Sequence, residues 1–359
     1  MRQTMAQIIE VIADSSLSGA PRHLLTLTKK LKNKFDIEVI CPAGWLADEL
    51  KCSGIKFTIV NFKSFSGFKS VSSLKRELVN RKADLIHFHG IRAGWLGTLA
   101  AKGLKSKKIY SEHLYTFDYH LKNQLREKLQ LQGLKRIVSS VDEIIVPSSA
   151  VEKFLSDKLN VLSSKIKIIP NGLDDYTVEE KKEKHKFGFI GSLNEQKGLS
   201  NLICAVRLLV RKFPDLCLEI IGDGPLKRQL EKESQDLEGN IKFIGTVELI
   251  SPYLATWNFL VAPSISESFG QVALEAAIAR RAIIATKVGG FSEVIEDGKT
   301  GILVKAGSPE DLVSAIEKLL KSDKLCQEMG MAARRRYDKL YTADSMATEF
   351  EKLYLNILG

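Results

Sequence analysis

The chain has 359 residues, of which 44% are hydrophobic and 27% are charged, and this composition excludes a disordered, collagen-like or low-complexity protein. At about 150 residues per domain, the length predicts two domains, each large enough to bury a core of its own. The formal net charge of +10 says nothing about the fold, but it is compatible with nucleotide phosphates, anionic lipids or nucleic acid as partners.

Short runs of β-branched and other apolar residues alternate with longer amphipathic segments along the whole chain. Glu10 and Asp14 interrupt the apolar stretch at residues 1–15, so we interpret this stretch as a first buried strand and not as a secretory signal. No apolar run approaches the ~20 residues that a membrane-spanning helix needs. In the first half, the runs predict strands at residues 7–13, 37–40, 57–60, 85–89, 108–111, 143–146 and 166–169.

In the second half, further runs predict strands at residues 187–190, 217–221, 241–244, 259–261, 282–285 and 301–304. Strands that alternate with helices form parallel sheets with both faces covered. These strands are too numerous for one ordinary open sheet. The sequence therefore predicts an α/β protein with two doubly wound, Rossmann-like domains.

A polar and highly charged segment at residues 173–185 predicts the linker between these domains. The N-terminal domain then spans residues 1–172, and the C-terminal domain spans residues 186–342. Residues 343–359 have helical spacing and can pack back on either half; we expect them on the N-terminal domain.

Five scattered cysteines without a C-x-x-C pair predict reduced thiols in a cytosolic protein. A zinc site is not expected, because no four-ligand set can be drawn from local pairs of residues.

The segment at residues 263–276, PSISESFGQVALEA, carries the clearest chemical signal. It follows an apolar strand and runs into a helix that we expect to begin near Gly270, and ligands bind at such loops in open α/β sheets. The backbone N–H groups of Phe269, Gly270 and Gln271 would then face a phosphate. Glu267 and Glu275 flank this site, and their carboxylates suit neutral sugar hydroxyls.

Together with other motifs, this segment resembles the retaining glycosyltransferases of family 4, which have the GT-B fold. The resemblance runs from about Ile8 to about Ile316. The other matching motifs, in chain order, are Gly19, 84–89 (DLIHFH), 111–113 (SEH), 169–174 (IPNGLD), 189–198 (FIGSLNEQKG), 221–225 (IGDGP) and 289–301 (GGFSEVIEDGKTG).

The resemblance implies a role for each charged residue of the site. Glu275 would accept hydrogen bonds from the ribose hydroxyls of a nucleotide sugar, and Glu267 would contact the transferred sugar beside its anomeric centre. Lys197 would pair with the diphosphate as charge develops on the leaving group. The alternative for Lys197 is a surface lysine in a turn.

Other implied contacts involve backbone groups and one histidine. The N–H groups of Gly270 and Gln271, with Gly19 across the cleft between the domains, would form the phosphate cradle. The nucleotide base would lie near Gly245 and Val247. His113 would lie beside the reacting face of the donor sugar, unless it is a histidine satisfied at a strand end.

Two histidines of one predicted strand, His87 and His89, share a face because they are two residues apart. His89 is nearer the carboxyl end of the strand and is the better candidate for the site, whereas we expect His87 in the core. We assign no role to His23, His120 or His185.

The chain departs from the family pattern at a point that matters for chemistry. The family has Gly-Arg-Leu where this chain has Gly191, Ser192 and Leu193. Ser192 lies in the donor-binding turn, but it cannot supply the charge of the arginine. Either Lys197 meets the diphosphate charge alone, or a nearby cation such as Arg22 substitutes.

The resemblance implies a metal-independent, retaining glycosyltransferase in the cytoplasm, at the inner face of the plasma membrane if its acceptor is lipid-linked. It would move a hexose from a nucleotide sugar, with UDP as the expected nucleotide, to a glycan or lipid-linked acceptor in cell-envelope, capsule or exopolysaccharide synthesis. No cofactor is expected, and the chain contains no D-x-D motif for a metal-bound diphosphate.

Other interpretations stay open. The same fold could carry a nucleotide-sugar epimerase, and Ser192 is compatible with a catalytically weak, glycosyltransferase-like binding subunit. The net charge alone suggests a nucleic-acid binder, but the chain lacks the aromatic interleaving and the modules of such proteins, so we expect no nucleic acid as a partner.

A basic stretch at residues 122–136 interleaves with Leu121, Leu125, Leu129 and Leu134. A basic amphipathic helix of this kind can lie on an anionic membrane surface and give peripheral membrane contact. The alternative is that the leucines pack in the core while the cations are solvated.

Overall fold

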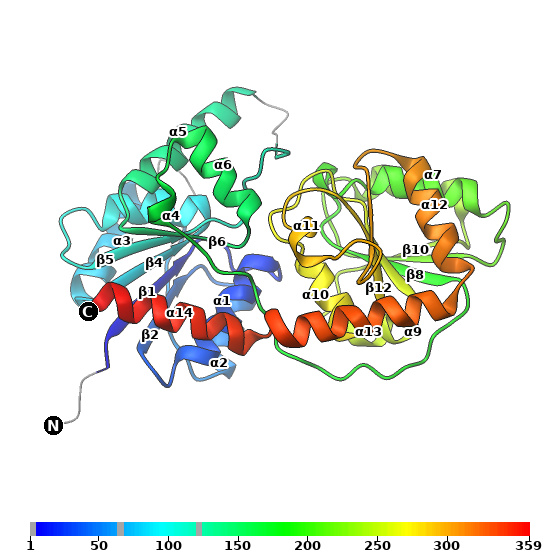
Figure 1. Cartoon of the computed structure of the whole chain (residues 1–359). Coiled ribbons are helices and arrows are strands. Elements are labelled where there is room, and N and C mark those ends of the chain that lie inside the picture. The colour runs from blue at the N-terminus through cyan, green and yellow to red at the C-terminus, as the bar shows by residue number, and fades with distance from the viewer. Residues whose placement is uncertain (1–4, 63–67, 120–123) are drawn as a thin grey trace. The chain divides into compact units, whose positions relative to one another are not determined.

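The alternating strands and helices build two parallel sheets, each in a unit of its own (Figure 1). The computed structural model describes residues 5–62, 68–119 and 124–359. The first unit comprises Met1–Asp174 and Ala343–Gly359, and the second comprises Asp175–Thr342. Each unit has a core of its own, so the expected pair of Rossmann-like α/β domains is confirmed.

The first unit contains a seven-stranded sheet in the order β3-β2-β1-β4-β5-β6-β7, with parallel pairing throughout. The order reverses between β1 and β4, which places β1 near the middle of the sheet, where it is almost fully buried. The strands are β1 (Gln7–Ile12), β2 (Asp36–Cys41), β3 (Lys56–Ile59), β4 (Leu85–His89), β5 (Lys107–Ser111), β6 (Glu143–Val146) and β7 (Ile166–Ile168).

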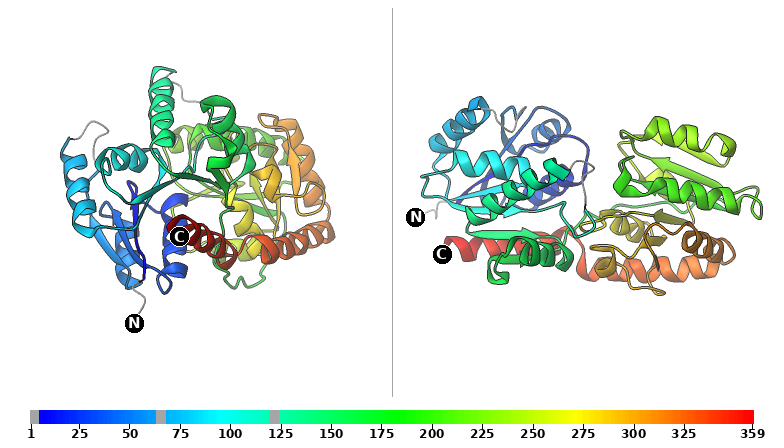
Figure 2. Two further views of the ribbon diagram at one scale, coloured as in Figure 1. Left: turned by 60° about the vertical axis from the view of Figure 1, so that its left-hand side comes forward. Right: turned by 90° about the horizontal axis from the view of Figure 1, so that it is seen from above.

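Helices cover both faces of this sheet (Figure 2). On one face, α1 (Gly19–Leu31), α2 (Trp45–Cys52) and α14 (Ala343–Leu358) pack around residues such as Ile8, Leu27 and Phe350. On the other face lie α3 (Phe68–Arg81), α4 (Gly90–Ala100), α5 (Gln124–Ser139) and α6 (Ser149–Leu159). Because side chains alternate along a strand, Glu10 points to the same face as Ile8, toward α1 and α14.

The second unit contains a six-stranded parallel sheet in the order β10-β9-β8-β11-β12-β13. The strands are β8 (Lys186–Ile190), β9 (Cys217–Ile221), β10 (Ile241–Gly245), β11 (Phe259–Ala262), β12 (Ala282–Thr286) and β13 (Ile302–Val304). α7 (Leu199–Leu209), α8 (Lys227–Glu233) and α12 (Pro309–Leu320) cover one face, and α9 (Ser251–Thr256), α10 (Gln271–Ile278) and α13 (Asp323–Leu340) cover the other (Figures 1 and 2).

The chain changes unit twice. The first change falls between Asp174 and Asp175, and the second between Thr342 and Ala343, so that α14 belongs to the first unit. Much of the segment expected as a linker lies against the second unit: the Lys181 N–H donates to the Ala255 carbonyl at 3.1 Å, and the Glu183 N–H to the Thr256 carbonyl at 2.9 Å.

Helix α5 exposes leucines that the sequence alternatively placed in the core. Leu125 is 68% exposed and Leu129 is 60% exposed, whereas Leu134 on the same helix is buried. The core alternative is therefore wrong for Leu125 and Leu129. Leu121 and Lys122 belong to the same expectation but lie outside the described residues, as does His120. Within the described residues, none of the helices is both long and apolar enough to cross a membrane.

Candidate functional site

In each unit, the loops that follow the parallel strands emerge at the carboxyl edge of the sheet, where ligands bind in this class of fold. In the second unit, the predicted site residues lie on the loops after β8, β10 and β11. Backbone hydrogen bonds tie these loops and the loop after β9 together: Gly191 N–H to Ile221 O at 3.0 Å, Gly222 N–H to Gly245 O at 2.8 Å, and Ile265 N–H to Gln196 O at 2.7 Å.

Lys197 ends a short 3₁₀ turn, η2 (Glu195–Lys197), and Gly198 follows it with a φ of +63°. A Cβ at Gly198 would lie 2.1 Å from the Pro263 carbonyl oxygen, so the close approach of these two loops requires glycine. The glycine thus lets the lysine reach the loop after β11.

Lys197 forms an ion pair with Glu267, with 2.6 Å between Nζ and Oε2. The two side chains are 25% and 13% exposed, so the pair is partly withdrawn from water. The Glu267 carbonyl also accepts a hydrogen bond from the Gly290 N–H at 3.2 Å. The structure therefore brings together the two charged side chains that sequence motifs placed on separate loops.

Helix α10 begins directly after Gly270, as expected. Gly270 has a φ of +96°, and a Cβ there would lie 2.4 Å from the ring of Phe291, so this turn also requires glycine. The side-chain Nε2 of Gln271 is buried and lacks a hydrogen-bond partner among the described residues. Glu275, one turn further along the helix, is 6% exposed. A buried amide donor without a partner is the kind of group that a ligand satisfies.

The remaining predicted residues of this half line the same edge. Gly245 ends β10 with a φ of +86°, and Val247 follows two residues later; both are half-buried. Ser192, in place of the family arginine, is exposed in the loop after β8.

The first unit contributes a cluster of histidines around Glu10. Glu10 pairs in register with His87, and Ile12 pairs with His89, so the three polar side chains are neighbours on β1 and β4. The fully buried Glu10 Oε2 accepts hydrogen bonds from His89 Nε2 at 2.7 Å and from His87 Nδ1 at 2.9 Å. His113 follows β5 and places its Nε2 3.4 Å from His89 Nδ1. His87 is fully buried, as a core residue would be.

Two residues that sequence reasoning missed complete the cluster. The Tyr354 hydroxyl, on α14, lies 2.8 Å from both Glu10 Oε1 and His87 Nδ1. His23, to which no role was assigned, lies on α1 with its ring centre 5.2 Å from that of His113. Both ring nitrogens of His23 are buried without a partner in the described part of the chain. Glu10, a charged residue inside the apolar run QIIEVI, was the available sequence signal.

Burial sets the protonation of the cluster. Burial lowers the pKa of His23 to about 3 and that of His89 to about 4, and it lowers the pKa of His113 well below its ordinary value. Burial by itself would raise the pKa of Glu10, but the electrostatic attraction and the hydrogen bonds of the His87 and His89 rings outweigh it and lower that pKa. At neutral pH the Glu10 carboxylate is therefore ionised, and the imidazoles of His23, His89 and His113 are neutral.

Two sets of these side chains could hold a metal ion by their spacing. They are His23, His89 and His113, and Glu10, His87 and His89; in each set, one ligand atom per residue lies within 4.8 Å of the others. In the second set, the ligand atoms already bond to one another, to Tyr354 and to Ser111.

The predicted phosphate contact of the first unit lies at the start of α1. Gly19 is exposed and opens the helix. The preceding Ser18 donates its hydroxyl to Asp14 Oδ2 at 2.9 Å and does not cap the helix. Because Pro21 has no N–H, the N–H groups of Gly19 and Ala20 are what the first turn can offer to a phosphate.

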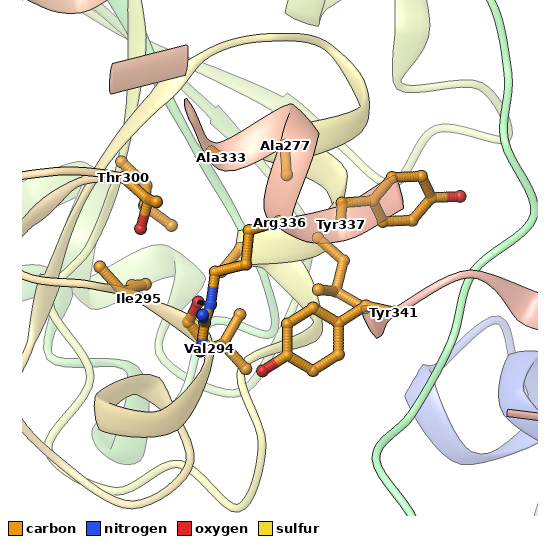
Figure 3. A pocket seen from close by; sticks show the side chains of 11 residues that line it. Ala277, Val294, Ile295, Thr300, Ala333, Arg336, Tyr337 and Tyr341 are labelled. Atoms are coloured by element: carbon orange, nitrogen blue, oxygen red, sulfur yellow. Dashed lines mark hydrogen bonds between the residues drawn. The ribbon is translucent and has the colours of Figure 1, made fainter. Parts of the chain in front are cut away.

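A separate pocket of about 250 Å³, a volume that includes space open to solvent, lies in the second unit between α10, α13 and the segment at residues 294–300 (Figure 3). Its lining is mainly apolar, and Tyr337 and Tyr341 lie on one side of it. Arg336 donates to the Val294 carbonyl at 2.9 Å and to the Glu293 carbonyl at 2.7 Å. Because the predicted site residues do not line this pocket, we do not assign it to the site.

Two family models match the chain, one for each half. The model described as "Glycosyltransferase Family 4" matches residues 17–176, and the model described as "Glycosyl transferases group 1" matches residues 175–336. The models meet at the point where the chain passes from the first unit to the second.

Relatives and solved structures match along most of the chain. A phosphatidyl-myo-inositol mannosyltransferase of Mycolicibacterium smegmatis is 26% identical over 89% of this chain and 86% of its own length. A capsular polysaccharide biosynthesis glycosyltransferase of Staphylococcus aureus is 24% identical over 94% and 97%. The crystal structure of Anabaena HepE with UDP-glucose is 18% identical, covers 98% of this chain and 99% of its own, and has a TM-score of 0.84, which shows a shared fold.

Proposed function

Because this chain belongs to the glycosyltransferases of group 1 and family 4, we propose that it transfers a hexose from a UDP-sugar to a glycan or lipid-linked acceptor. The choice of nucleotide is supported by HepE, which binds UDP-glucose, and the acceptor class by the names of the two relatives. On this proposal, the chain serves cell-envelope, capsule or exopolysaccharide synthesis.

The observation that carries the donor side of the proposal is the ion pair of Lys197 and Glu267 beside the start of α10. When a diphosphate binds, Lys197 would turn from Glu267 to the phosphate oxygens, and Glu267 would be released to accept from hydroxyls of the transferred sugar. Nε2 of Gln271, which lacks a partner among the described residues, would gain one. Glu275 would hold the ribose.

We propose transfer with retention at the anomeric centre, in which acceptor and leaving group occupy the same face of the sugar. The leaving phosphate would help to deprotonate the acceptor hydroxyl. Charge that develops on that phosphate would be met by Lys197 and by the N–H groups at the start of α10, so the proposal requires no metal at the diphosphate. His113 of the first unit would contact the donor sugar.

The proposal also includes peripheral contact with an anionic membrane at the inner face of the plasma membrane. Its support is helix α5, where the exposed Leu125 and Leu129 lie among cationic residues of the described part of the stretch, 124–136. Apolar side chains that enter the interface and cations that meet anionic headgroups are the two elements of such binding.

A thermal-shift screen across UDP-sugars tests the donor, because a ligand that binds only the folded state raises the melting temperature.

Glu275→Ala should then raise the donor Kd by about 5- to 150-fold, which corresponds to the ~1–3 kcal/mol of a hydrogen bond to a charged group. Glu267→Ala should mainly lower turnover, and Glu238→Ala, an exposed glutamate of the same unit, should change neither. Unchanged binding and turnover in both site variants would refute the donor site, and an epimerised sugar without acceptor would refute transfer.

A further inference from the structure

The hydrogen bonds around Glu10 determine where protons lie on the neighbouring imidazoles. An ionised carboxylate can only accept hydrogen bonds. His89, which is neutral, must therefore carry its proton on Nε2, 2.7 Å from Glu10 Oε2, and its Nδ1 holds a lone pair. The Tyr354 hydroxyl must donate to Glu10 Oε1 for the same reason.

This arrangement extends to His113. The lone pair of His89 Nδ1 faces His113 Nε2 at 3.4 Å, and the two rings are nearly parallel, with 8° between their planes. A contact of two nitrogens is favourable when one donates, and Nδ1 of His89 has no proton to give. His113 therefore carries its proton on Nε2, and its Nδ1 is an acceptor.

We propose that Glu10 and Tyr354 are positioning residues, which act through His89 to hold the ring of His113 and to keep its proton on Nε2. This inference rests on the proposed function only for the claim that His113 contacts the donor sugar. It makes the last helix, α14, part of the chain of hydrogen bonds that ends at His113.

The other side chains around His113 are compatible with control of its tautomer through His89. His23 packs edge-on against His113, but both of its ring nitrogens lack a hydrogen-bond partner in the described residues, so it restrains the ring without selecting a tautomer. His87 forms a side branch, because its Nε2 contacts the Ser111 hydroxyl at 2.7 Å and not His113.

Tyr354 is placed by packing and not by its hydroxyl alone. Its ring is fully buried, with ring centres 5.7 Å from Phe35 and 5.9 Å from Phe350. Tyr354→Phe therefore removes the hydroxyl, with its contacts to Glu10 Oε1 and His87 Nδ1, and leaves the ring in place. Ser111→Ala is the matched control, because it removes a hydroxyl of the same cluster from the branch that does not lead to His113.

The test is NMR of the full chain with ¹³C,¹⁵N-labelled histidine, since ring nitrogen shifts report the tautomer of each of the six histidines. At pH 7, we expect His113 with its proton on Nε2 in the native chain and in Ser111→Ala. Glu10→Gln should give a mixture of tautomers at His113. Tyr354→Phe should shift the tautomer ratio of His113 in the same direction. A His113 that stays on Nε2 in both variants, or that carries its proton on Nδ1 in the native chain, would overturn the inference.

If Glu10→Gln does not fold, Tyr354→Phe decides alone. A second measurement is release of UDP from the UDP-sugar with the largest thermal shift. Glu10→Gln should lower kcat by about tenfold or more while the donor KM stays within about twofold, as expected when a reacting geometry is lost and binding is not. A changed tautomer with unchanged kcat would refute the contact of His113 with the donor sugar, and it would leave the positioning of His113 itself intact.

Discussion

The proposed neutralisation of the leaving diphosphate depends on two positions of the second unit, Lys197 and Ser192. Lys197 is held by Glu267, while Ser192 is exposed at the place where the family has an arginine. If the leaving diphosphate is neutralised by side chains, Lys197 carries more of that burden here than in relatives with both cations.

Lys197→Ala should therefore lower kcat by about 10²-fold, the typical effect of removing one group that stabilises developing charge. Ser192→Arg should fold normally and raise the turnover of the native chain or partly rescue Lys197→Ala. Lys212→Ala is the control, because Lys212 pairs with Glu317 in the same unit. Steady-state kinetics decide, and a turnover that is insensitive to Lys197→Ala would show that another group meets the charge.

His23 makes the stability of the first unit depend on pH. Its pKa is about 3 when folded and about 6.5 in an unfolded chain. Between these values the unfolded state binds a proton that the folded state does not, so stability falls as pH decreases, by up to about 1.4 kcal/mol per pH unit for this residue.

His23→Phe should reduce that slope between pH 6.5 and pH 5, because a phenyl ring binds no proton. Hydrogen exchange of peptides from β1 and β4 measures the local opening free energy at each pH. His89 and His113 remain in the variant and keep part of the slope. Equal slopes in the native chain and the variant would mean that His23 is protonated in the folded state.

At the scale of elements, vesicle binding by the native chain and by variants of α5 tests the proposed membrane contact. Its exposed leucines and cations predict co-sedimentation with anionic vesicles and not with neutral ones, weakened by salt because charge attraction is screened. Lys128→Glu with Lys135→Glu should weaken binding, since each cation near the surface contributes ~1 kcal/mol. Lys102→Glu with Lys105→Glu, two exposed lysines after α4, is the control of equal charge change. Recovery in the supernatant with both vesicle types would support an acceptor that is not in a membrane.

At the scale of the whole molecule, chelators test whether transfer needs a metal. The proposal places no metal at the diphosphate, so activity in EDTA should match activity without it. A second assay measures activity with added Zn²⁺, which His23, His89 and His113 could bind by their spacing. Loss of activity in EDTA that a divalent ion restores would contradict the proposed handling of charge by Lys197 and N–H groups.

Much of the fold and part of the site followed from the sequence, because both depend on local pattern. Alternating apolar and amphipathic segments predicted the strands; several, such as β4 and β9, match at both ends, and others differ by a residue, such as β1, which ends at Ile12. The site loop of α10 was recognisable because a glycine, two glutamates and a helix start lie within one short segment. Gly198 and Gly270 stand where the backbone geometry admits no side chain, so the glycines themselves mark these turns in the sequence.

The cluster around Glu10 was decided by tertiary structure alone. Its members come from β1, α1, β4, the loop after β5 and α14, and Tyr354 is 344 residues from Glu10 along the chain. Strand pairing sets Glu10 beside His87, and the packing of α14 on α1 brings Tyr354 to the same carboxylate. No local pattern encodes such contacts, because they depend on strand order and on which face of the sheet the last helix covers. For the same reason, no role for His23 could be read from the sequence. Two placements of Leu125 and Leu129, in the core or on a membrane-facing surface of the helix, stayed open until the structure was known.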